Sequence, residues 1–202
     1  SAPAKHAISL ISHMSCFANY LQSIFSGAVG YDCVNVFMAP FFEGMPANQI
    51  KQMAQHMIFT FAQNQGSRGG QLVFSDFNMY LEVPEHYKNT PAIGPGGKNI
   101  EGATYKDYEK EARAFLYAIL QVLDECDRNG ANFNFPKILL HLSDEKDYSN
   151  DALFDYACQI NAKRGSVYIV FDRGSSQVSM CCRLSHKMSE EEKNNATKDP
   201  DE

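Results

Sequence analysis

Hydrophobic residues recur at helical spacing in four segments of the chain. Apolar side chains three and four positions apart predict helices over residues 7–25, 47–63 and 150–165, with one more between Thr104 and Gly130. That last helix is the best marked, because Thr104 is a suitable N-cap with Asp107 three positions later. The face that it is expected to bury consists of Tyr108, Ala112, Phe115, Leu116, Ile119 and Leu123.

Other apolar runs are too short and too continuous for helices. Residues 135–143 and 166–174 hold the runs ILLHL and VYIVF, which are typical of strands buried on both faces of a parallel sheet. A further β-type run begins at Leu72 and ends near residue 77. The alternation of strands and helices predicts an α/β fold with three parallel strands preceded by two helices. Residues 83–103, rich in glycine and proline, are expected to form a long loop of functional importance or without order.

Composition narrows the classes of partner. The chain has 202 residues, 44% of them hydrophobic, enough for one compact domain. A net charge of −6 without a basic stripe argues against nucleic acid or an anionic membrane as the main partner, although one small nucleotide remains compatible with it. No apolar run approaches the roughly 20 residues that span a bilayer, and no signal peptide is visible. We therefore expect a cytoplasmic protein, and the start without methionine suggests a segment of a longer one.

Common sequence motifs fail on their spacing. The six cysteines include no C-x-x-C pair and the six histidines no ligand pair, so neither a disulfide framework nor a metal site is expected. The loop AIGPGGKN lacks the first glycine and the Ser or Thr of a phosphate-binding loop, since Ala92 and Asn99 stand there. The glycines of this loop are compatible with a flexible turn or with a close approach of the backbone to a ligand. No nucleophile elbow of the G-x-S-x-G type exists.

Two adjacent cysteines, Cys181 and Cys182, remain. They stand in a polar segment about ten residues after the last predicted strand, near the edge of an α/β sheet where ligands bind. An accidental pair packed beside the strand end and a reactive pair are equally compatible with composition and spacing.

Six phrases taken together resemble one family. In this order, RGGQLVFSDFNMYLEVP, PAIGPGGK, YKDYEKEA, FPKILLHL, YIVFDRG and CCRLS are similar to segments of the anaerobic (class III) ribonucleoside-triphosphate reductases, which are glycyl radical enzymes. The resemblance covers residues 1–188. It implies that these residues are part of a ten-stranded α/β barrel, and that residues 189–202 continue the cysteine-bearing finger loop or form a polar tail.

The resemblance also implies a chemistry and its residues. In the family, a cysteine followed by arginine becomes a thiyl radical that removes the 3′ hydrogen of a ribonucleotide, and the deoxyribonucleotide needed for DNA replication forms. The matching residue is Cys182, with Cys181 as an alternative or accessory. We expect Gln71, Ser75 and Asn78, which follow a glycine turn, to bind the substrate. Neither the zinc-binding cysteines nor the glycyl radical segment of the family occurs in these residues, so the isolated chain is expected to be inactive.

Cofactors and partners follow from the same resemblance. The complete enzyme is expected to need a glycyl radical made by an activase with an iron–sulfur cluster and S-adenosylmethionine, together with a structural zinc. It is expected to be a homodimer that takes ribonucleoside triphosphates, while this segment itself holds no cofactor. Two alternatives stay open, namely a catalytically silent remnant or interaction piece of a split reductase, and an enzyme of the pyruvate formate-lyase type, which also uses adjacent cysteines.

Overall fold

The protein is built around a parallel sheet. The computed structural model describes residues 2–63, 72–143, 146–172, 177–179 and 185–187. Four strands form the sheet in the order β1-β2-β5-β6, and every neighbouring pair is parallel. Their bounds are β1 Val29–Tyr31, β2 Ser75–Tyr80, β5 Lys137–Ser143 and β6 Val167–Asp172.

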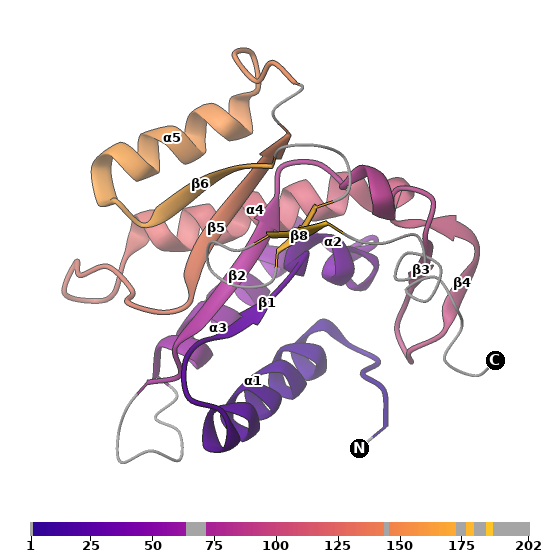
Figure 1. Ribbon diagram of the computed structural model, residues 1–202, viewed down its shortest axis with the longest axis horizontal. Coiled ribbons are helices and arrows are strands. Elements are labelled where there is room, and N and C mark those ends of the chain that lie inside the picture. Colours follow the sequence, from indigo (N-terminus) through magenta and orange to yellow (C-terminus); the bar gives the residue numbers. More distant parts are fainter. Residues whose placement is uncertain (1, 64–71, 144–145, 173–176, 180–184, 188–202) are drawn as a thin grey trace.

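Helical segments connect the strands. The α-helices are α1 Ala7–Ile24, α2 Val34–Met38, α3 Ala47–Gln63, α4 Glu109–Glu125 and α5 Ala152–Arg164. Short 3₁₀ helices accompany them in the described part of the chain, at Ala39–Phe42, Glu85–Tyr87 and Tyr105–Tyr108. In Figure 1 the strands follow one another from β6 to β1 down the view, with α1 beyond β1 and α4 behind the sheet.

One face of the sheet is apolar and packs against helices. The apolar sides of α3, α4 and α5 form one buried cluster with alternate residues of two strands. These residues are Phe77 and Met79 of β2 and Ile138, Leu140 and Leu142 of β5. Side chains of a strand alternate between its faces, so Asp76, Asn78, Tyr80, Leu139 and His141 face the other way. The two faces therefore differ in chemistry, and the second carries the polar side chains.

Two antiparallel strand pairs lie outside this sheet. β3 (Pro91–Ile93) and β4 (Asn99–Thr104) pair within the segment that the sequence predicted to be a loop. At the tip of that hairpin, the N–H of Gly96 donates to the carbonyl of Ala4 at 2.7 Å. The second pair is β7 (Gln177–Ser179) with β8 (Ser185–Lys187).

The α/β prediction is confirmed, and so are most of its helices. The first two long helices occupy 7–24 and 47–63, and Thr104 and Asp107 form a reciprocal capping box ahead of α4. All six residues predicted for the buried face of that helix are buried. The helix ends earlier than the predicted glycine stop, at Glu125, where Cys126 takes a positive φ of 61°.

Three predictions about the strands were wrong. The described residues form a sheet of four strands, because β1 forms within residues that read as a break between helices. β2 begins at Ser75 and ends at Tyr80, three residues later than predicted at its end. β6 is only partly buried, with Tyr168 39% and Phe171 60% exposed, because it is the last strand of the described sheet.

Candidate functional site

Polar side chains meet on the sheet face that lies away from the helices. His141 of β5 is at their centre. Its Nδ1–H donates to the Asp172 carboxylate at the end of β6, with distances of 2.9 and 3.0 Å to the two oxygens. Its Nε2 lies 2.7 Å from the amide oxygen of Asn78 on β2. One imidazole ring thus joins three neighbouring strands.

The contacts continue to the first strand. The ring of Tyr80 stacks on that of His141, with centroids 4.6 Å apart and planes at 20°. Asp32 directly follows β1, and its Oδ1 accepts a hydrogen bond from the Tyr80 hydroxyl at 3.1 Å. Burial raises the pKa of the Asp32 carboxyl group, and the hydrogen bond from Tyr80 opposes this shift only in part. Asp32, Asn78, Tyr80, His141 and Asp172 are called the cross-strand polar row below.

A fully buried amide fixes the end of β2 beneath this row. Asn35 of α2 is 0% exposed, and its side-chain oxygen accepts from the N–H of Tyr80 at 2.9 Å. Its amide nitrogen donates to the carbonyl of Tyr80 at 2.7 Å and lies 3.3 Å from the carbonyl of Ala112 in α4. The side chain pairs with Tyr80 as a neighbouring strand would, so α2 and α4 determine where the Tyr80 ring lies.

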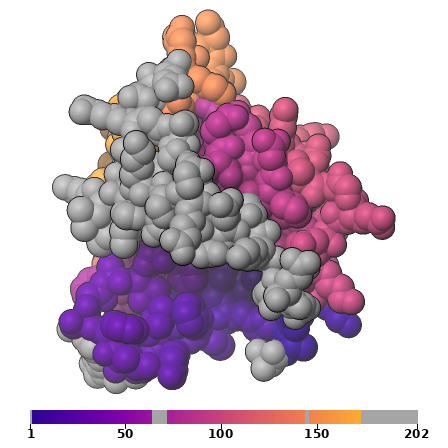
Figure 2. Space-filling view, turned by 45° about the vertical axis from the view of Figure 1, so that its right-hand side comes forward, coloured from indigo at the N-terminus to yellow at the C-terminus, as the bar shows by residue number. Residues whose placement is uncertain are grey.

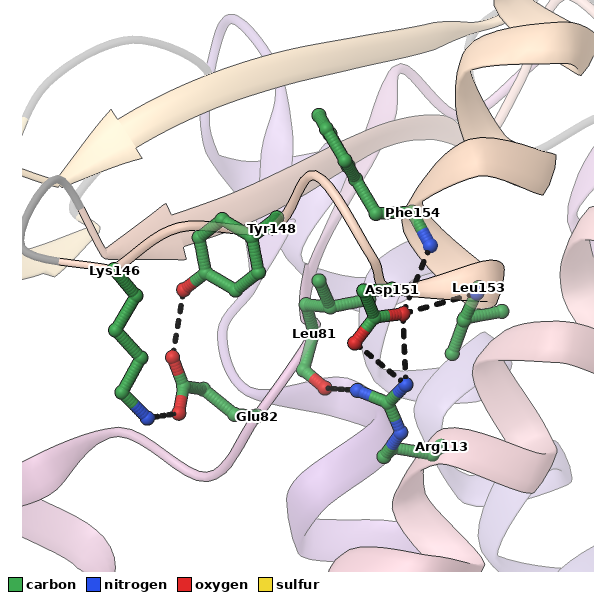
Figure 3. Close-up of polar contacts among 8 residues, drawn as sticks. All are labelled: Leu81, Glu82, Arg113, Lys146, Tyr148, Asp151, Leu153 and Phe154. Carbon is green, nitrogen blue, oxygen red and sulfur yellow. Dashed lines mark hydrogen bonds and ion pairs between the residues drawn. The ribbon is translucent and has the colours of Figure 1, made fainter.

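Ion pairs connect the loops that follow β2 and β5, as Figure 3 shows. Arg113 of α4 donates to both oxygens of Asp151 at 2.9 Å and to the carbonyl of Leu81 at 2.9 Å. Asp151 also accepts from the N–H groups of Leu153 and Phe154 and so caps α5. We call Arg113, Asp151 and Leu81 the loop brace.

A second group of contacts lies beside the brace (Figure 3). Glu82 accepts from the hydroxyl of Tyr148 at 2.6 Å and pairs with Lys146. The same hydroxyl accepts from the N–H of Ser143, the last residue of β5. Together with the brace, these contacts hold the loops at the carboxyl edge of the sheet, where the cross-strand polar row ends.

A cavity of about 600 Å³ adjoins the row at the end of β1. It lies between α1, the residues from Tyr31 to Phe41, and the β3–β4 hairpin. Its described walls are mainly apolar and aromatic, with Asp32 as their single carboxylate. Volumes of this size are typical of sites for small molecules.

The structure places only part of the predicted site. Cys181, Cys182 and Gln71 lie outside the described residues, although β7 and β8 stand on either side of the cysteine pair in the sequence. Ser75 and Asn78 are both buried in β2. Three positions separate them, so they point to opposite faces and are not brought together. Asn78 belongs to the polar row, whereas Ser75 lies on the face that packs against helices.

Sequence reasoning missed most members of the polar row. The six histidines have no metal-ligand spacing, so the sequence assigned no role to His141, and it singled out neither Asp32 nor Asp172. One signal was present, namely a histidine inside the otherwise apolar run ILLHL. Its partners are 63 and 31 positions away, so no local pattern identifies them.

Neither a metal cluster nor a membrane span emerges from the described part of the chain. Within those residues, no three of the His, Cys, Asp and Glu side chains gather in a way that could hold a metal ion. The described helices are likewise too short or too polar to cross a membrane.

Comparison with known proteins identifies the family. The family model described as anaerobic ribonucleoside-triphosphate reductase matches residues 1–199, which is nearly the whole chain. The chain belongs to this family of reductases. No curated protein sequence matches it significantly.

Solved structures of anaerobic ribonucleotide reductases share the fold of this reductase segment. One is 22% identical, with a TM-score of 0.65, and the match covers 85% of the segment and 28% of that chain. The Thermotoga maritima enzyme in complex with dATP and CTP is 22% identical, with a TM-score of 0.66 and coverage of 86% and 30%. The same enzyme with glycerol in the active site is 21% identical, with a TM-score of 0.66, and the match covers 85% of the segment and 29% of that chain. The segment thus spans less than a third of these relatives.

Proposed function

We propose that this segment takes part in the anaerobic reduction of ribonucleoside triphosphates to deoxyribonucleoside triphosphates, with Cys182 as the residue that becomes a thiyl radical. The family match over residues 1–199, which includes the Cys-Cys-Arg sequence at 181–183, carries the proposal. The parallel sheet supports it, because ligands of such sheets bind at the carboxyl ends of the strands.

Cysteine is suited to the first step of this reaction. Its S–H bond is weak enough for a hydrogen atom to move reversibly between sulfur and a sugar carbon. The Cys182 sulfur takes the 3′ hydrogen of the ribose, the C2′–O bond breaks, and the 2′ hydroxyl leaves with a proton as water. The sulfur then returns the hydrogen to C3′. An external donor, formate or a small redox protein, supplies the two electrons of the reduction, and with a further proton these form the C2′–H bond that replaces the broken C2′–O bond.

The described residues can provide a wall for such a site. The cross-strand polar row lies on the sheet face opposite the one that packs against the described helices, and the loop brace holds the loops at the adjacent edge. A radical must be kept from water and from other side chains. On this face the side chains of Tyr80, Leu139 and His141 are buried, so little water reaches them.

The remaining partners of the proposed enzyme lie outside this segment. The radical source would be a glycyl radical made by an activase with an iron–sulfur cluster and S-adenosylmethionine, and a zinc site would stabilise the region that bears it. The proposed enzyme is a homodimer. Family resemblance alone supports these parts of the proposal.

Substitution of the two cysteines tests the proposal. In the complete, activated, oxygen-free reductase that carries this segment, Cys182→Ser should abolish formation of deoxyribonucleotides, because an alcohol O–H bond is too strong for the exchange. The glycyl radical signal in electron paramagnetic resonance should persist. Cys181→Ser is the matched control, one residue away with the same atomic change.

Turnover that survives Cys182→Ser but not Cys181→Ser would assign the radical to the other cysteine. Turnover that survives both substitutions would remove the thiyl step from this segment. An activated parent enzyme that carries the radical but produces no deoxyribonucleotide would favour the alternative of a catalytically silent piece.

A further inference from the structure

We propose that Asp172, held in place by His141, accepts a hydrogen bond from a ribose hydroxyl of the ribonucleotide. The inference rests on the proposed function and assigns the part of the substrate that meets the cross-strand polar row. Neither residue was expected from the sequence to bind substrate.

Of the two residues His141 and Asp172, only Asp172 is placed to contact a ligand. The His141 side chain is 3% exposed and its two ring nitrogens already face Asp172 and Asn78. The Asp172 side chain is 18% exposed, and each of its oxygens has lone pairs beyond the one that faces His141. The imidazole therefore fixes the carboxylate, and the carboxylate is the group that presents itself for binding.

Charge decides which part of a nucleotide fits there. Asp76 and Asp172 belong to this face of the sheet, and Asp32 extends it past the end of β1. Lys137 is the only lysine or arginine in the four strands of the described sheet. It is the first residue of β5, at the end of the sheet away from Asp172, and it is the register partner of Asp76 on β2. A triphosphate would be repelled by these carboxylates. A hydroxyl group, which donates a hydrogen bond to a carboxylate, is attracted.

The position along the chain agrees with this assignment. Asp172 is the last residue of β6, and the sequence runs from there through β7 to the cysteine pair. Under the proposed function the sulfur of Cys182 acts on the ribose at C3′. A carboxylate that holds the ribose hydroxyls at this edge would orient the sugar, while the phosphates lie against residues beyond the described strands.

Binding without turnover tests the inference. The probes are CTP, 2′-deoxy-CTP and 3′-deoxy-CTP, titrated by calorimetry into the complete reductase before radical activation. The parent should prefer CTP to at least one deoxy analogue, because the analogue leaves the carboxylate without its donor. Asp172→Asn should reduce that preference roughly ten- to hundredfold, the range of one hydrogen bond to a charged group.

Three further variants separate binding from folding. Asp76→Asn removes the same charge from the same face at the other end of the strands, and it should leave the preference intact. His141→Phe should weaken the preference as Asp172→Asn does. His141→Gln, which keeps an N–H donor, should recover part of it. Because each value is a ratio of affinities within one protein, a loss of folded material does not change it.

Two outcomes would overturn the inference. The preference for CTP could be the same in Asp172→Asn as in the parent, or all three probes could weaken equally, which is the result of a purely structural role. Either result leaves the proposed function intact if the activated parent still makes deoxyribonucleotides. An activated parent that carries the glycyl radical and binds CTP but makes no deoxyribonucleotide contradicts the proposed function instead.

Discussion

Asn35 illustrates how one buried side chain determines the geometry of a site that it does not enter. It bonds both the N–H and the carbonyl of Tyr80, so the position of the Tyr80 ring depends on it. Tyr80 in turn stacks on His141, which holds Asp172. These contacts therefore connect α2 to β6, the last strand of the described sheet.

Loss of the Asn35 amide should destabilise the fold. Asn35→Ala leaves two backbone groups of Tyr80 buried without partners, and each costs about 1–3 kcal/mol. We expect the free energy of unfolding in urea to fall by about 2–6 kcal/mol in total. Asn129→Ala, at an exposed position, is the control and should change it by less than about 0.5 kcal/mol. Equal effects of the two substitutions would contradict this role of Asn35.

At the scale of elements, the loop brace combines two tasks in one residue. Asp151 caps the first turn of α5 and pairs with Arg113 of α4, which also bonds the loop after β2. Burial favours the neutral form of its carboxyl group. The hydrogen bonds from Arg113 and from the N–H of Phe154 outweigh that effect, so the pKa of Asp151 is lowered.

The lowered pKa of Asp151 predicts an acid-sensitive brace. A carboxylate with a depressed pKa in the folded state stabilises the fold above its unfolded pKa, about 3.9, and this contribution is lost as the pH falls through the folded value. Asp151→Asn keeps a capping side chain without the charge. Its unfolding free energy should be lower than that of the parent at pH 7, and the difference should shrink below about pH 4. A difference independent of pH would rule out the ion pair as its cause.

The sequence predicts elements whose signals are local. The long helices and the capping box at Thr104 follow from spacing and from two residues three positions apart. β1 was missed because its three residues pair with Ser75, Asp76 and Phe77, more than 40 positions away. The β3–β4 hairpin was missed because β3 has only three residues and the segment around it is rich in glycine and proline.

The candidate site divides in the same way. Asn78 of the polar row could be named from its place after a glycine turn, whereas the cysteine pair, named from a motif, lies outside the described residues. Asp172 and His141 could not, because their significance comes from a contact between two strands that only the parallel register brings together. A polar residue in an apolar strand signals that a partner exists and does not identify it.

Considered as a whole molecule, the described sheet ends in two strands of different character. β1 has only three residues, while β6 is six residues long and exposes Phe171 and Tyr168. Such an edge offers unpaired backbone groups next to apolar side chains, which favours association with other chains. The relatives, which are about three times longer, share this fold over the matched part only.

We therefore expect the 202-residue chain to be poorly soluble when expressed alone. Size-exclusion chromatography with light scattering should show oligomers whose size increases with concentration, because exposed strand edges pair between copies. Phe171→Lys should shift the distribution toward monomer, since a charge on an edge strand opposes such pairing. A monodisperse monomer of the parent chain that melts cooperatively would contradict the expectation.

The contact between the N-terminal segment and the hairpin tip bears on how the protein can be handled. Gly97 has a φ of +74°, and a side chain there would meet Pro3 at 2.8 Å, while Gly96 bonds Ala4. Pro3 and Ala4 also line the cavity beside Asp32. An affinity tag or fusion partner joined ahead of residue 3 would thus be attached next to the cavity wall.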